Sequence, residues 1–123
     1  MATLIPKISL QTQGSMTDDL DIKTIHSISK ISDPKEFGRV EITTTATKTI
    51  MPTNSSYCYI YMKLQEGTNA TDYLTVSIGV TSDVRLRIGE FLFLPLINSK
   101  EVKAIAVGGT CKAEYGYWSR SEA

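Results

Sequence analysis

Two stretches near the end of the chain decide the fold: Arg85 to Leu96, RLRIGEFLFLPL, and Val107 to Trp118, VGGTCKAEYGYW. In the first, a short alternating strand breaks at Gly89 and a dense apolar strand stops at Pro95. In the second, the Gly108-Gly109 pair indicates a tight turn with positive φ, after which a last strand rich in aromatic residues begins. Such an ending is typical of a compact all-β domain, and neither stretch places a residue for catalysis.

From Arg39 onward, the sequence predicts seven short strands separated by turn residues. Their spacing of roughly 8–12 residues is typical of a β-sandwich or a small barrel. One or two strands from the N-terminal third would raise the number to eight or nine. The sequence therefore predicts an all-β, antiparallel sandwich that is jelly-roll-like, with seven to nine strands.

Alternation along these strands predicts which side chains are buried. In Tyr57 to Leu64, YCYIYMKL, the even-numbered residues share one face and the tyrosines share the other. Glu90 to Leu96 is apolar on both faces, which predicts a central strand that is covered on both sides. The predicted core includes Ile60, Leu74, Val76, Ile78, Phe91 and Phe93.

The first 35 residues have a different pattern and are predicted to form an extended arm, with the sandwich at 36–119 and a tail at 120–123. Ala2 to Gln11 is a possible strand, which Pro6 would confine to a sheet edge. Leu20 to Ile31 is β-branched and predicts extended structure. Asp33 to Gly38 carries capping signals, with a proline at the first helical position, and predicts a single helical turn.

Charge and composition narrow the classes of partner. Thirteen basic and thirteen acidic residues cancel, and they are scattered singly, so the sequence predicts neither nucleic-acid nor membrane binding. The N-terminal residues lack the apolar core of a signal peptide, and no window is long enough to span a membrane. Folding is expected in a cytoplasm, where Cys58 and Cys111 would remain thiols and pack as small apolar residues.

Candidates for chemistry are few, and each has a plainer explanation. His26 has no acidic or cysteine partner at ligand spacing, so a surface or interface histidine is expected. Asp18, Asp19 and Asp21 lack the rest of a calcium loop and are expected to be solvated. Glu90 and Glu114 are expected at a rim or beside Arg85 or Arg87. The sequence therefore predicts no catalytic residue, no metal site and no cofactor, and a protein that is not an enzyme.

The strongest candidates for a binding surface are aromatic and aliphatic. Three tyrosines on one strand face form an amphipathic strip, which is enriched at protein interfaces and in sugar-binding clefts. The alternative is a second, partly covered face of the sandwich. Tyr115 and Tyr117 would either extend this strip or fill the core. The predicted interface residues are Tyr57, Tyr59 and Tyr61 together with Leu4, Ile8 and Leu10 of the arm.

From Tyr57 to Trp118, half of the chain, the order of strand and turn phrases resembles small virion proteins of tailed bacteriophages. The phrases are YCYIYMKL, YLTVSIG, RIGEFLFLPL and the closing GGTCKAEYGYW. The resemblance implies a β-sandwich structural component, either capsid decoration (cement) or a tail-associated part. It carries over no functional residue, and the N-terminal third has no counterpart.

The expected function is that of a non-enzymatic phage virion protein, in first place a capsid decoration protein that binds and stabilises the head lattice. Its partners would be the major capsid protein or other virion proteins and further copies of itself, with a trimer favoured. It would be made in the host bacterial cytoplasm and reside in the virion. The alternative is a carbohydrate-binding or adaptor module on a tail or fibre, which would use the tyrosines as a stacking platform.

Overall fold

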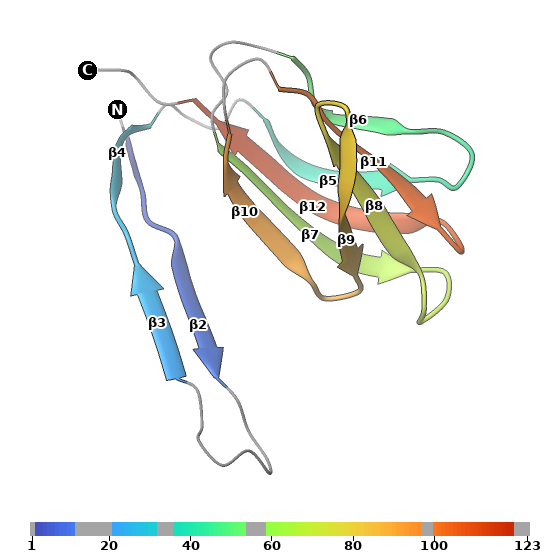
Figure 1. The fold of residues 1–123 in the computed structure, drawn as a ribbon, viewed down its shortest axis with the longest axis horizontal. Helices are drawn as coiled ribbons and strands as arrows, with labels where there is room; N and C mark the ends of the chain where they lie inside the picture. The colour runs from blue at the N-terminus through green and yellow to red at the C-terminus, as the bar shows by residue number, and fades with distance from the viewer. Residues whose placement is uncertain (1, 12–20, 32–35, 54–58, 97–99, 120–123) are drawn as a thin grey trace.

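The computed structural model of the chain describes residues 2–11, 21–31, 36–53, 59–96 and 100–119. Within these residues the protein is all-β and contains no helix (Figure 1). The strands of the arm are β1 (Ala2–Leu4), β2 (Lys7–Gln11), β3 (Asp21–Ile25) and β4 (Ile28–Ile31). The strands of the sandwich are β5 (Glu36–Ile42), β6 (Lys48–Met51), β7 (Tyr59–Gly67), β8 (Tyr73–Ile78), β9 (Thr81–Arg87), β10 (Phe91–Pro95), β11 (Val102–Val107) and β12 (Cys111–Trp118).

Two antiparallel four-stranded sheets pack face to face, which confirms the predicted all-β sandwich. Their strand orders are β10-β7-β12-β5 and β6-β11-β8-β9. Alternate residues of both sheets point into one continuous apolar core, as the period of a strand requires. The largest side chains that are almost fully buried there are Ile42, Met51, Ile60, Met62, Leu64, Leu74, Val76 and Val102.

The strands of the sandwich pair from the two ends of the chain inward. The first strand pairs with the last, β5 with β12, and β6 then pairs with β11 in the other sheet. Inside these, β7 pairs with β10 and β8 pairs with β9. The segment from Glu36 to Trp118 is therefore one nested set of pairs that closes at the turn between β8 and β9.

The predicted core is confirmed in part. Ile60, Leu74 and Val76 are buried, and Ile78 packs half-buried against them. The two phenylalanines of β10 do not belong to this core, because Phe91 is 54% exposed and Phe93 packs in a separate cluster.

The prediction that 90–96 forms a central strand was wrong. β10 is the edge strand of its sheet, and Leu92 and Leu94 supply the side chains that pack on the core. The strand is apolar on both faces because its outer face belongs to an aromatic surface, described below.

The N-terminal strands form an arm that pairs only with itself in the described residues. β1 pairs with β4 and β2 pairs with β3, both antiparallel. Both ladders break at the same level, at Ile5-Pro6 on one strand and at His26-Ser27 on the other. The backbone N–H of His26 donates to the carbonyl of Pro6 at 3.3 Å across this break. The arm lies beside β10 and extends away from the sandwich (Figure 1).

The helical turn that the sequence predicts at Asp33–Gly38 lies partly outside the described residues, which begin again at Glu36. Its last three residues, Glu36 to Gly38, start β5, so the prediction was wrong there. In register they lie opposite Tyr117, Gly116 and Tyr115 of β12. Pairing with a strand far along the chain satisfies their backbone groups, and this outweighs the local capping signals.

A buried carboxylate ties two turns together at one end of the sandwich. Asp72 is 2% exposed and accepts hydrogen bonds from the backbone N–H and the side-chain amide of Asn69, at 2.8 and 3.3 Å. The carboxylate of Asp72 also lies against the predicted Gly-Gly turn, where Gly108 has φ +99°. A Cβ on Gly108 would collide with Oδ1 of Asp72.

We expect Gly108→Ala to destabilise the protein more than Gly89→Ala. Both glycines have positive φ, at which a non-glycine residue costs roughly 1–3 kcal/mol. Only Gly108 also faces Asp72, since nothing lies within 4 Å of a Cβ at Gly89. Equilibrium urea unfolding of the two variants measures the difference. Equal losses of stability would show that Asp72 does not pack against this turn.

Candidate functional site

The outer faces of the two sheets differ in chemical character. On the β6-β11-β8-β9 sheet the outer face is mostly polar, and the guanidinium of Arg85 lies over the ring of Tyr73, 4.3 Å from its centroid. On the other sheet one part of the outer face is aromatic, while Arg39, Glu41 and Lys112 lie exposed farther along the same face. We call the aromatic part the aromatic face; its residues are Phe37, Tyr59, Tyr61, Phe91, Phe93 and Trp118.

Strand register aligns this surface in a row across all four strands. Phe37 of β5 lies opposite Gly116 of β12, which lies opposite Tyr61 of β7, which lies opposite Phe93 of β10. Gly116 leaves room in this row, because a Cβ there would approach Phe37 to 2.6 Å and Trp118 to 3.2 Å. Two rings therefore lie directly over the backbone of β12.

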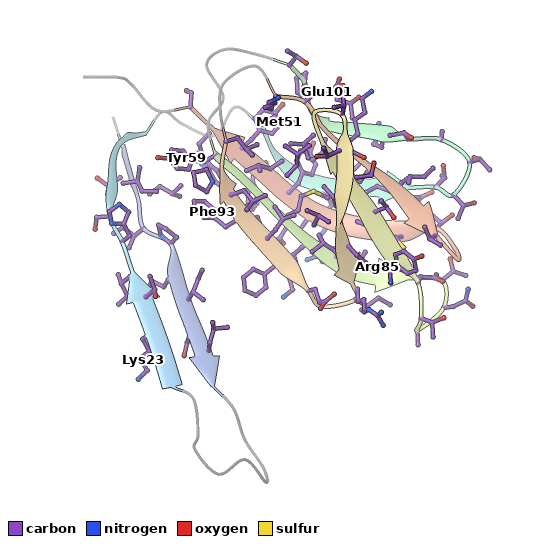
Figure 2. The ribbon with its side chains drawn as sticks, viewed as in Figure 1. Lys23, Met51, Tyr59, Arg85, Phe93 and Glu101 are labelled. Carbon is purple, nitrogen blue, oxygen red and sulfur yellow. The ribbon has the colours of Figure 1, made fainter. Side chains whose placement is uncertain are left out.

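The arm is anchored on one end of the aromatic face. Tyr59 stacks on Phe93, with ring centroids 5.9 Å apart and planes 10° apart. Ile28 of the arm is buried against Tyr59, and Leu4 and Trp118 pack around the pair. Figure 2 shows Tyr59 and Phe93 on the side of the sandwich that faces the arm.

This anchor corrects the predicted tyrosine strip. Tyr59 is only 9% exposed, because the arm and Phe93 cover it, so it is not free to bind a partner. Tyr61 is half-buried, and Tyr57 lies outside the described residues. Tyr115 and Tyr117 stack on each other at 6.4 Å and belong to the core.

Beyond the anchor, an open groove of ≈ 280 Å³ separates the arm from the aromatic face. One wall comes from the arm and the other from the sheet. The lining residues are Leu4, Pro6, Lys7 and Ile8 of the arm with Tyr61, Phe91, Phe93 and Trp118 of the sandwich. Apolar side chains thus dominate both walls.

The structure brings together some of the predicted interface residues. Leu4, Ile8 and Tyr61 meet at the groove, whereas Leu10 lies farther along the arm and is 51% exposed. The sequence prediction missed Phe91 and Phe93. Their alternation with Leu92 and Leu94 was the available signal, since it places the two phenylalanines on one face and the two leucines on the other.

A polar cluster lies beside the groove. The hydroxyl of Tyr61 donates to Oε1 of Glu114 at 2.9 Å, and the amide of Gln65 donates to Oε2 at 3.1 Å. Of the two expectations for Glu114, a rim position or an arginine partner, the second was wrong, because its hydrogen-bond partners are Tyr61 and Gln65. Glu90 is exposed and accepts a hydrogen bond from the backbone N–H of Arg87 at 2.6 Å.

Burial, the hydrogen bond to Glu114 and the charge of that carboxylate together raise the pKa of Tyr61 to about 12. A folded-state pKa above the unfolded value of about 10 means that the stability from the protonated phenol is complete below pH 10 and is lost as the pH approaches 12. We expect the free energy of unfolding of wild type to fall between pH 10 and pH 12 as Tyr61 ionises. In Tyr61→Phe, which has no phenol at this position, this part of the decrease should be absent. Unfolding titrations from pH 9 to 12 test this; identical profiles would contradict it.

Of the remaining candidates, the structure describes only the side chain of His26, which is exposed. The side chains of Asp18, Asp19 and Asp21 lie outside the described residues. In the part of the chain that the structure describes, no three histidine, cysteine, aspartate or glutamate side chains gather to hold a metal ion. The same residues include no helix long and apolar enough to cross a membrane.

Of the two cysteines, only Cys111 lies among the described residues, where it is buried and not in a disulfide. Burial, together with the negative charge of Asp72, raises the pKa of its thiol. The prediction that Cys58 stays a thiol lies outside the described residues.

Comparison of the chain with protein-family models, with curated proteins and with solved structures gave no match.

Proposed function

We propose that this is a non-enzymatic assembly protein that docks on other protein subunits. The observation that carries the proposal is the aromatic face, with its open apolar groove and the arm beside it. Contiguous exposed apolar surface on a stable domain marks a place where another surface binds. Phe37 and Phe91 are 59% and 54% exposed on this face, and Leu10 and Ile25 of the arm are 51% and 67% exposed.

The groove suits protein side chains better than a small ligand. Its volume of ≈ 280 Å³ lies at the lower limit of the range of about 300–1,000 Å³ that is usual for ligand pockets. Polar side-chain groups on its walls are few: the ammonium of Lys7, the indole N–H of Trp118, and the hydroxyl of Tyr61, which already donates to Glu114. Apolar side chains of a partner would bury the apolar walls, while the exposed ammonium of Lys7 can remain in water.

We infer further that the sandwich is a jelly roll. The nested pairs β5·β12, β6·β11, β7·β10 and β8·β9 are what results when one long hairpin rolls into two four-stranded sheets. Such a fold gives a rigid body with one face free for docking, while the arm reaches beyond it.

Within this class, the particular function proposed is that of a phage capsid decoration protein, which binds the major capsid protein and stabilises the head lattice. The resemblance of Tyr57 to Trp118 to small phage virion proteins supports this, as does the absence of net charge, which favours dense packing of identical copies. The protein would act in the virion as a homo-oligomer, with a trimer favoured because three-fold sites exist on an icosahedral shell.

A carbohydrate-binding role on a tail or fibre is the second candidate. The Tyr61–Glu114–Gln65 cluster favours it, because aromatic rings beside carboxylate and amide groups are what a sugar needs. Against it, the Glu114 carboxylate already accepts hydrogen bonds from both Tyr61 and Gln65.

The test is the composition of purified virions of the virus whose genome encodes the chain. We expect the protein in fixed stoichiometry with the major capsid protein, and its loss from particles that carry Phe91→Ser. Virions that lack the protein, or a chain encoded in no viral genome, would overturn the proposal. Retention of Phe91→Ser on the particle together with binding to a bacterial glycan array would favour the second candidate.

A further inference from the structure

The distal ladder of the arm, β2 with β3, carries an apolar strip on one face. Ile8 and Leu10 alternate along β2, so their side chains share a face, and register places Ile8 opposite Thr24 of β3. Ile8 and Leu10 are 36% and 51% exposed. A two-stranded ladder is marginally stable at best in water, so this ladder requires a packing partner.

The chain itself shows what the strip fits. Ile8 already lines the groove together with Phe91 and Phe93, so this end of the strip lies at the aromatic face. The contact does not continue along the arm, because Leu10 is outside the groove and the distal ladder runs away from the sandwich (Figure 1). The two complementary surfaces therefore belong to one chain but do not close on each other.

The break in both strands of the arm, at Ile5-Pro6 and at His26-Ser27, divides it into a proximal ladder (β1 with β4) and the distal ladder (β2 with β3). The proximal ladder is fixed by Ile28 and Leu4 against Tyr59 and Trp118. The distal ladder is joined to it through two residues on each strand, where a single backbone hydrogen bond links His26 to Pro6. Such a junction lets the distal ladder change direction while the proximal ladder stays anchored on the sandwich.

We propose that the distal ladder docks in the groove of a second copy of this chain, with Ile8 and Leu10 packed on Phe91 and Phe93 of that copy. An identical arm fits the groove because the chain's own Ile8 already meets the same wall. A single type of contact then buries both the apolar strip of the arm and the groove. Identical subunits that exchange an element associate in this way. The proposal rests on the assembly function proposed above and names its first partner.

Cross-linking of purified protein tests this without any particle, so its failure is distinct from failure of the virion test. In a Cys58→Ser background, with the buried Cys111 retained, Leu10→Cys and Phe91→Cys are made as separate proteins and mixed under mild oxidation. We expect a mixed disulfide dimer, which only two different copies can form. Cys58→Ser alone gives the background level.

Two matched controls define the geometry. Ser9→Cys is exposed on the opposite face of β2, and Val80→Cys lies in the turn between β8 and β9, where the side chain is 100% exposed. We expect Leu10→Cys with Phe91→Cys to give several-fold more mixed dimer than either Ser9→Cys with Phe91→Cys or Leu10→Cys with Val80→Cys.

Two results would overturn the proposal. One is equal cross-linking in all pairs, which reports random collision. The other is an intrachain disulfide in the double variant Leu10→Cys/Phe91→Cys with no mixed dimer from the single variants, which means that the arm closes on its own groove.

Discussion

Replacement of Leu74 by alanine is expected to lower the free energy of unfolding by about 2–5 kcal/mol, the range for large-to-small changes in a packed core. Leu74 is 0% exposed and lies on β8, between β11 and β9. Side chains of the facing sheet surround it, so the cavity cannot close without moving a strand. Equilibrium urea unfolding, followed by the fluorescence of the single tryptophan, measures the loss.

The neighbouring residue on the same strand provides the control. Thr75 is half-buried and points to the polar outer face of its sheet. We expect Thr75→Ala to change the stability by less than about 1 kcal/mol, within the usual range for surface positions. Similar losses for the two variants would mean that β8 does not face the core as described.

Replacement of Trp118 by alanine is expected to have two effects at once. Trp118 lies over Gly116 and packs around the stacked pair of Tyr59 and Phe93. Truncation of a fully buried tryptophan costs about 3–5 kcal/mol, and because Trp118 is half-buried we expect the lower end of that range. The second effect is loss of the arm's anchor, since Ile28 packs in the same cluster.

Amide hydrogen exchange separates these two effects. We expect Trp118→Ala to speed exchange in β1 and β4 well beyond any change in the strands of the sandwich. Phe37→Ala is the matched control, because Phe37 covers the other side of Gly116, is 59% exposed and does not line the groove. If exchange in the arm is unchanged in Trp118→Ala, or rises equally in Phe37→Ala, the arm is not anchored on this tryptophan.

The sandwich could be predicted from sequence because alternation alone identifies a strand with one buried face. In β7 the residues predicted to point inward, Ile60, Met62 and Leu64, are all fully buried. β10 shows the limit of this reasoning. Its two faces are both apolar, and periodicity cannot tell a core face from a docking face. Whether β10 lies at the edge of its sheet depends on its pairing with β7, and no local sequence pattern indicates this pairing.

The site could be predicted only in outline for a related reason. Leu4, Ile8 and Tyr61 were expected at an interface and do meet at the groove. Tyr59 was expected to be exposed because no residue near it in the sequence covers it. In the structure it is covered by Ile28 of the arm, which lies far away in the sequence. The start of β5 was misjudged in the same way, since its partner, the end of β12, lies far along the chain.

We expect the protein to associate through the aromatic face and not through the opposite face of the sandwich. Sedimentation velocity over a concentration series compares wild type with Phe91→Ser and with Tyr73→Ser, which removes an aromatic ring from the outer face of the other sheet. We expect oligomers for wild type and Tyr73→Ser and a folded monomer for Phe91→Ser. A monomeric wild type, or association that Tyr73→Ser abolishes and Phe91→Ser retains, would contradict it.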